Sequence, residues 1–73
     1  MSEALRKRLG ARIRNARVAA DLSQLALAHK LGRKGCDAGS YICKLESGAH
    51  EPRVETLRKI AKVLATTTEE LIG

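Results

Sequence analysis

The sequence predicts an all-α protein, a compact single domain of five short helices that covers residues 1–73. Apolar residues recur along the chain at spacings of three and four, which are typical of helices packed on one face. Glycine, proline and capping residues divide the chain into segments of helix length. The intervening loops are short, and no segment is repeated or of low complexity.

The first two helices are marked by serine caps. Residues 3–20 are expected to form a helix with Ser2 as its N-cap, and residues 24–31 a second helix capped by Ser23 and closed by Gly32. The first helix carries one apolar stripe: Leu5, Leu9, Ile13, Ala16 and Ala20. The second carries a shorter one: Leu27, Ala28 and Leu31.

The middle of the chain is a glycine-containing loop followed by a third helix. Residues 33–39 are expected to form the loop, and the helix runs from about Ala38 or Ser40 to Ser47, with Gly48 just past its end. Asp37 is the better capping residue at the start of this helix.

The last two helices follow a proline and a capping box. A fourth helix is expected to have Pro52 near its first turn, where the missing N–H costs little. Its buried residues are predicted to be Val54, Leu57, Ile60, Ala61 and Leu64. Thr67 and Glu70 have the capping-box spacing that opens a short fifth helix.

The charge of the chain is unevenly distributed. The 14 Lys and Arg residues exceed the 8 Asp and Glu residues, for a net charge of +6. Residues 1–44 carry ten of the cations and three of the acids, whereas residues 45–73 carry four cations and five acids. A basic half beside a nearly neutral half indicates a face for a polyanion.

The composition argues against several classes of protein. No apolar run approaches the roughly 20 residues of a membrane span. The cations Arg6, Lys7 and Arg8 interrupt the N-terminal segment that a secretory signal would need, and they are more typical of a solvated helix face. These features favour a cytoplasmic protein without a membrane partner.

The reactive side chains do not form a recognisable catalytic or metal-binding pattern. Cys36 and Cys43 are expected to be reduced thiols, and with His29 and His50 they lack the spacing of a metal site. No nucleophile–base set, paired carboxylates or phosphate-cradling glycine loop is evident. The sequence therefore predicts a protein that is not an enzyme, with no cofactor, no metal and no small-molecule ligand.

The informative segment extends from Leu22 to Pro52. It predicts two short helices joined by a glycine turn, with the small residue Ala28 where they cross. Ile42 and Leu45 are expected to anchor the second of these helices in the core, which leaves its outward face polar and cationic. A helix of this kind fits the major groove of DNA, which is about 12 Å wide.

Five segments, taken in order, resemble the lambda repressor/Cro-like (XRE-type) helix-turn-helix family: LGARIRNAR, LSQLALAHKLG, SYICKLESG, EPRVETLRKIAKVLA and TTTEEL. The resemblance covers nearly the whole chain. It implies a sequence-specific regulator of transcription that binds double-stranded DNA as a homodimer on a near-palindromic operator. Phage Cro-type repressors, restriction–modification controllers and small antitoxins all remain open as subtypes.

The resemblance also implies roles for individual residues. Base reading is expected from Gly39, Ser40 and Lys44, with Tyr41 beside them, and Lys44 is the best candidate for a guanine contact. The implied phosphate contacts come from Ser23, Gln24 and Arg53, and Gln24 also braces the recognition helix. Arg17 and Glu46 match a pair that forms a structural salt bridge.

The chain departs from the family pattern in three places. The interval from Gly32 to Ile42 is longer than usual, so the turn is an extended loop in which Arg33 and Lys34 are expected to contact phosphate. Gly39 offers no side chain to a base. Leu25 occupies a position that is usually an exposed acid.

Two further expectations concern partners. The homodimer is predicted to form through the fourth and fifth helices, because Leu71 and Ile72 follow the capping box with little chain left to cover them. A protein-interaction module, such as an antitoxin or adaptor subunit, is the alternative function. Such a module would not need cations at Arg33, Lys34, Lys44 and Arg53 together.

Overall fold

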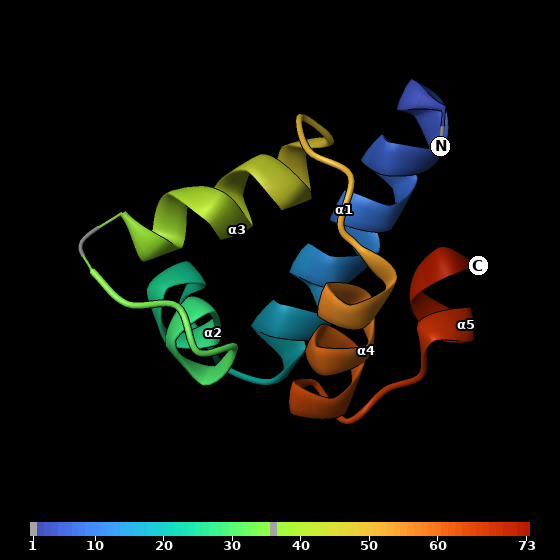
Figure 1. The fold of residues 1–73 in the computed structure, drawn as a ribbon. Coiled ribbons are helices and arrows are strands. Elements are labelled where there is room, and N and C mark those ends of the chain that lie inside the picture. Colours follow the sequence, from blue (N-terminus) through green and yellow to red (C-terminus); the bar gives the residue numbers. More distant parts are fainter. Residues whose placement is uncertain (1, 36) are drawn as a thin grey trace.

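A computed structural model describes residues 2–35 and 37–73, and over these residues the chain forms five α-helices and no strand. The helices are α1 (Glu3–Ala19), α2 (Gln24–Lys30), α3 (Ala38–Ser47), α4 (Val54–Val63) and α5 (Thr68–Ile72). Figure 1 shows their order in space. The predicted all-α fold is confirmed, with α1 and α2 each ending one residue earlier than expected. Cys36 lies outside the described residues.

Side-chain caps define the starts of three helices. Ser2, Ser23 and Thr67 each accept a hydrogen bond from the backbone N–H three residues later, at 3.2, 3.0 and 3.1 Å. The Glu70 carboxylate accepts a hydrogen bond from the Thr66 hydroxyl at 2.6 Å. These caps satisfy N–H groups that have no partner inside the helix, which explains why α1, α2 and α5 begin where the sequence predicted.

The helices α3 and α4 begin without a side-chain cap. Asp37 occupies the N-cap position of α3, but its side chain makes no capping hydrogen bond. Arg53 is the extended N-cap residue of α4, so Pro52 lies just before the first turn, near where it was expected. Val54, predicted to be buried, is 64% exposed, because the stripe of α4 that reaches the core begins one turn later at Leu57.

Aliphatic side chains from all five helices form one core, and Tyr41, the only aromatic residue, packs at its edge. The buried members are Leu9, Ile13, Leu27, Ala28, Ala38, Ile42, Leu45, Leu57, Ile60, Ala61, Leu64 and Leu71. The predicted stripe of α1 is only partly buried, because Leu5 and Ala20 lie at its exposed ends.

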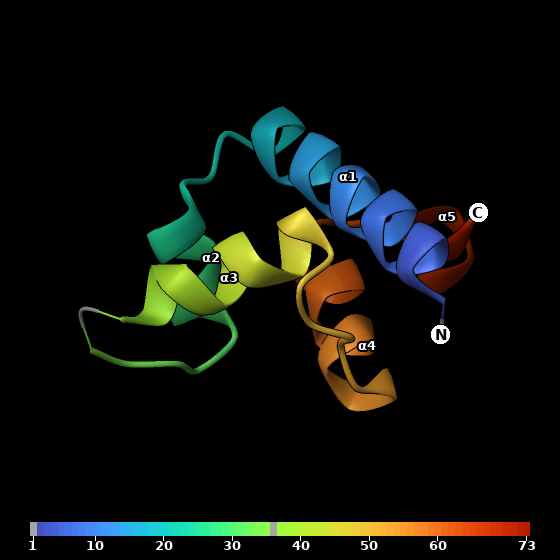
Figure 2. The same cartoon turned by 90° about the horizontal axis from the view of Figure 1, so that it is seen from above.

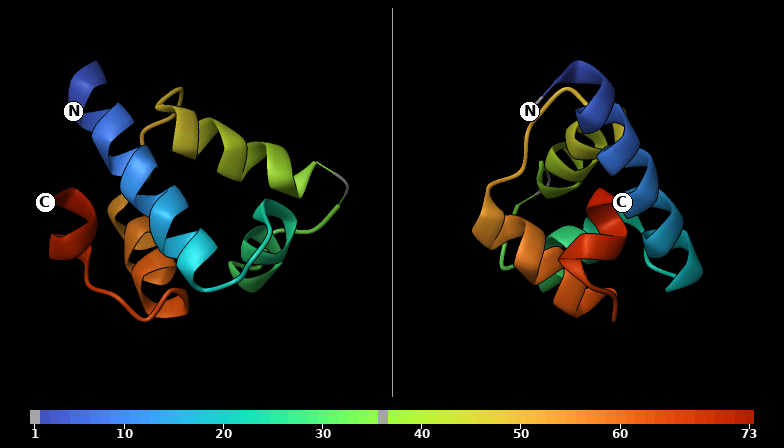
Figure 3. Two further views of the ribbon diagram at one scale, coloured as in Figure 1. Left: turned by 180° about the vertical axis from the view of Figure 1, so that it is seen from behind. Right: turned by 90° about the vertical axis from the view of Figure 1, so that its right-hand side faces the viewer.

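The helix α5 folds back against α1 and α4 and carries Leu71 into the core (Figures 1 and 3). Leu71 is 2% exposed, so the prediction that it lies on an uncovered dimer surface is wrong. Ile72 is 48% exposed. Arg12 on α1 donates a hydrogen bond to the backbone carbonyl of Glu70 at 2.9 Å, which fastens α5 to α1.

The helix α1 packs against α3 and lies above it in the view of Figure 2. The two backbones approach closely at Gly10. A Cβ atom at Gly10 would lie 2.7 Å from the carbonyl carbon of Glu46 and closer still to the carbonyl oxygens of Leu45 and Glu46. The backbones approach so closely that only glycine fits. This close contact sets the distance between α1 and α3.

Replacement of Gly10 by alanine is expected to lower the free energy of unfolding by about 1–3 kcal/mol, because the methyl group overpacks the crossing. Gly39→Ala is the matched control. Its added methyl would make an ordinary contact 3.5 Å from the Leu25 nitrogen, and alanine favours a helix by about 1 kcal/mol over glycine. Urea unfolding of both variants measures the difference, and a Gly10→Ala protein as stable as wild type contradicts the close crossing.

Candidate nucleic-acid interface

The helix α3 separates a buried apolar side from an exposed polar side. Ile42 and Leu45 are almost completely inaccessible to solvent and hold the helix to the core. The exposed side carries Ser40, Cys43, Lys44 and Ser47. Because these positions are three or four residues apart, they line one face of the helix. The face is small and polar, with one cation.

The C-terminal end of α3 is fixed by backbone geometry and by a side chain of α1. Gly48 ends the helix in the left-handed conformation, at a φ of 84°, and the Ala49 N–H donates to the Lys44 carbonyl at 2.9 Å. The Arg6 side chain donates to the Gly48 carbonyl at 3.1 Å. Arg6 was expected on a solvated helix face, but it reaches from α1 to the end of α3.

A hydrogen-bonded ion pair holds the side of α3 that faces α1 and α2. Arg17 on α1 contacts the Glu46 carboxylate on α3 through Nε at 2.6 Å and through a second guanidinium nitrogen at 3.3 Å. Gln24 on α2 donates from its side-chain amide to the same carboxylate at 3.0 Å. Arg17 also donates to the Leu22 carbonyl at 2.7 Å. We call Arg17, Gln24 and Glu46 the three-helix brace.

The brace is largely removed from water. The side chains of Arg17 and Glu46 are 12% and 5% exposed. A pair in this position is held by several hydrogen bonds at once, so loss of one partner leaves the other charge poorly solvated. The brace therefore fixes the rotation of α3 relative to α1 and α2. One of the two N–H groups of the Gln24 side-chain amide donates to the Glu46 carboxylate.

The four residues expected to read bases do not all lie on the exposed face. Ser40 and Lys44 do, whereas Gly39 packs beside Leu25 of α2 and Tyr41 is half-buried at the flank of α3. Sequence reasoning missed Cys43 and Ser47. The burial of Ile42 and Leu45 was predicted, and the helical period from those two positions places residues 43 and 47 on the opposite side.

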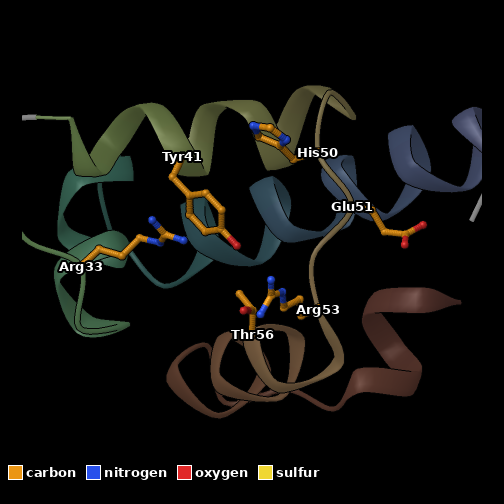
Figure 4. A pocket seen from close by; sticks show the side chains of 6 residues that line it. All are labelled: Arg33, Tyr41, His50, Glu51, Arg53 and Thr56. Atoms are coloured by element: carbon orange, nitrogen blue, oxygen red, sulfur yellow. The ribbon is translucent and has the colours of Figure 1, made fainter.

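The residues expected to contact phosphate lie on both sides of α3. Ser23 and Gln24 are at the start of α2, and Gln24 is itself part of the brace. Arg33 and Arg53 line the same cavity on the other side, next to Tyr41 (Figure 4). Lys34 is exposed in the loop between α2 and α3. The exposed face of α3 is thus flanked by two separate groups of hydrogen-bond donors.

The match to known proteins agrees with this geometry. A family model described as helix-turn-helix matches residues 13–71, which include α2, α3 and the loop between them. The chain belongs to the lambda repressor/Cro-like (XRE-type) helix-turn-helix family. This family is a DNA-binding regulatory fold, in which the second helix of the motif typically lies in the major groove.

No curated protein and no solved structure matches this chain. Among the described residues, no helix has the length and apolar character to cross a membrane. In the same part of the chain, no three His, Cys, Asp or Glu side chains gather as metal ligands would.

Glu46→Gln is expected to lower the free energy of unfolding by about 3–5 kcal/mol, because it leaves the Arg17 charge without a carboxylate in a poorly hydrated position. The matched control is Glu3→Gln. Glu3 pairs with Lys7 at 3.3 Å on the exposed surface of α1, where an ion pair contributes at most about 1 kcal/mol. Thermal unfolding of the two variants distinguishes them. Equal melting temperatures for Glu46→Gln and wild type would show that the brace carries no stability.

Proposed function

We propose that this protein is a sequence-specific transcription regulator that binds double-stranded DNA as a homodimer, with α3 in the major groove. The observation that carries the proposal is the exposed face of α3. It is polar and cationic, while the rest of the helix is anchored by Ile42, Leu45 and the three-helix brace. A rigidly held helix can present the same donors to every bound site, which sequence readout requires.

Base readout is proposed to centre on Lys44. It is exposed near the middle of the face, where an ammonium group can donate to the O6 and N7 atoms of guanine. Ser40 is one turn before it and Ser47 one turn after, so their hydroxyls reach neighbouring base pairs. Gly39 contributes backbone rather than side chain to the interface, because its Cβ position is turned toward Leu25.

Contacts to phosphate are proposed on both flanks of α3, from Ser23 and Gln24 on one side and from Arg33, Lys34 and Arg53 on the other. Two flanks of this kind suit a helix lying between the two strands that border the major groove. The same cations argue against a module that only binds protein, because such a module gains nothing from collecting them around one helix.

The homodimer is proposed to form through α4 and α5. Figures 1 and 2 show α5 at the end of the molecule away from α2 and the start of α3, so a contact there leaves the recognition helix free. The exposed Ile72 offers an apolar contact, and residues 45–73 are nearly neutral overall. A two-fold dimer spaces its recognition helices about 34 Å apart and matches a near-palindromic site.

Selection of bound sequences from random duplex DNA tests the function directly. The expected result is an enriched motif with two inverted halves whose centres are one helical turn apart. Recovery of unenriched random sequence would contradict sequence-specific binding. A single enriched half without its inverted copy would contradict the dimer but not the readout.

Lys44→Ala is expected to weaken binding to the selected site by about 1–3 kcal/mol and to relax the preference at one base position. Gln24→Ala should instead weaken all sequences to a similar degree. Arg8→Ala, which removes an exposed cation of α1, is the control and should change neither the affinity for the selected site nor the affinity for random DNA. Fluorescence anisotropy with selected and random duplexes measures the two affinities. An unchanged ratio of the two affinities in Lys44→Ala excludes base readout by this residue.

Sedimentation at micromolar concentration tests assembly. The wild-type protein is expected to sediment as a dimer, and Ile72→Glu should shift it to the monomer because a carboxylate then replaces the apolar contact. Val18→Glu is the matched control, since Val18 is also exposed but lies on α1. A wild-type species with the mass of one chain, binding as one chain per site, contradicts the homodimer.

A further inference from the structure

A cavity beside the exposed face of α3 collects side chains from four segments of the chain. The extended loop after α2, α3 and α4 contribute one each, and the connection between α3 and α4 contributes three. The lining residues are Arg33, Tyr41, His50, Glu51, Arg53 and Thr56. Figure 4 shows that all of them except Glu51 converge on the space between α3 and α4.

Hydrogen-bond donors dominate this cavity. The guanidinium groups of Arg33 and Arg53 approach it from opposite segments, and the Tyr41 and Thr56 hydroxyls lie between them (Figure 4). The one carboxylate, that of Glu51, points away from the other side chains in this view. An arginine presents its N–H groups in a planar fork that matches the oxygens of a phosphate.

The aromatic ring of Tyr41 holds one of these arginines. The central carbon of the Arg33 guanidinium lies 3.4 Å from the ring centroid. The imidazole of His50 flanks the ring as well, with the two centroids 6.4 Å apart and the planes tilted by 31°. A guanidinium stacked on an aromatic face keeps its edge N–H groups free for a further ligand. The stack thus positions an arginine that would otherwise extend from an exposed loop into solvent.

We propose that this cavity is a phosphate site, in which Arg33 and Arg53 hold a single phosphate group and the ring of Tyr41 positions Arg33. Tyr41 is then a positioning residue and not a reader of bases. The extended loop between α2 and α3 supplies the second arginine of the site. The assignment of the ligand to the DNA backbone rests on the proposed function, whereas the site itself does not.

The first experiment uses inorganic phosphate and the free protein. Titration followed by NMR is expected to shift the amide signals around His50 and Arg53 saturably. Arg33→Ala and Arg53→Ala should each weaken this binding by about tenfold, the scale of one charge-assisted hydrogen bond. Arg8→Ala is the control for loss of one cation, and chloride at equal ionic strength is the control for screening. Shifts spread over all cationic residues, or equal shifts with chloride, would overturn the site.

The second experiment tests the role of the ring. Tyr41→Phe keeps the stack and should retain the phosphate affinity and the ring-current shift of the Arg33 side-chain protons. Tyr41→Leu should lose both, and its melting curve shows whether it is folded. Arg33→Lys is an independent check of the stack at an exposed loop position. It keeps the positive charge and loses the planar fork. Wild-type phosphate affinity in both Tyr41→Leu and Arg33→Lys would overturn the positioning role.

The third experiment identifies the source of the phosphate. In the selected duplex, each backbone phosphate is replaced in turn by a neutral methylphosphonate. The wild-type protein is expected to lose at least tenfold in affinity at one phosphate of each half-site, and Arg33→Ala and Arg53→Ala should each reduce the loss at that same position. Losses reduced at two different phosphates would overturn the shared site. A random-sequence result in the selection removes the proposed function, while the titration with inorganic phosphate still decides the site.

Discussion

The position of α3 depends on one carboxylate. Glu46 receives hydrogen bonds from Arg17 of α1 and Gln24 of α2, so a single side chain of α3 joins all three helices. Its 5% exposure means that these partners replace water almost completely. An apolar contact in the same place would not fix the rotation of α3, since the hydrophobic effect is non-directional. The directional bonds of the brace determine which residues of α3 face outward.

The two flanks of α3 are built by different physical means. On one side, charge and hydrogen bonds in a poorly hydrated position connect regular helices. On the other, a guanidinium from an extended loop rests on an aromatic ring at the edge of the core. The first arrangement resists rotation of the helix. The second leaves an arginine fork available, which is why the two-arginine phosphate site is proposed at this flank.

Much of the fold was predictable because the signals that determine it are local. A serine or threonine at a helix start acts on an N–H three residues away, and Ser2, Ser23 and Thr67 do so here. A glycine that ends a helix needs only its own backbone conformation, as Gly48 shows. Helical spacing likewise predicted that Ile42 would be buried. Resemblance to the family added the residues of the brace, which are separated too widely in sequence for periodicity to connect them.

Local patterns by themselves determined which segments are helical and which side of each is apolar. The packing of helices against one another decided which apolar residues are covered. Val54 continues an apolar stripe and is exposed, whereas Leu71 near the chain end is buried because α5 folds back onto α1 and α4. The stack of Arg33 on Tyr41 also belongs to tertiary structure. A loop residue follows no helical period from which its neighbours could be predicted. The contact between the Arg33 guanidinium and the Tyr41 ring therefore depends on the path of the folded chain.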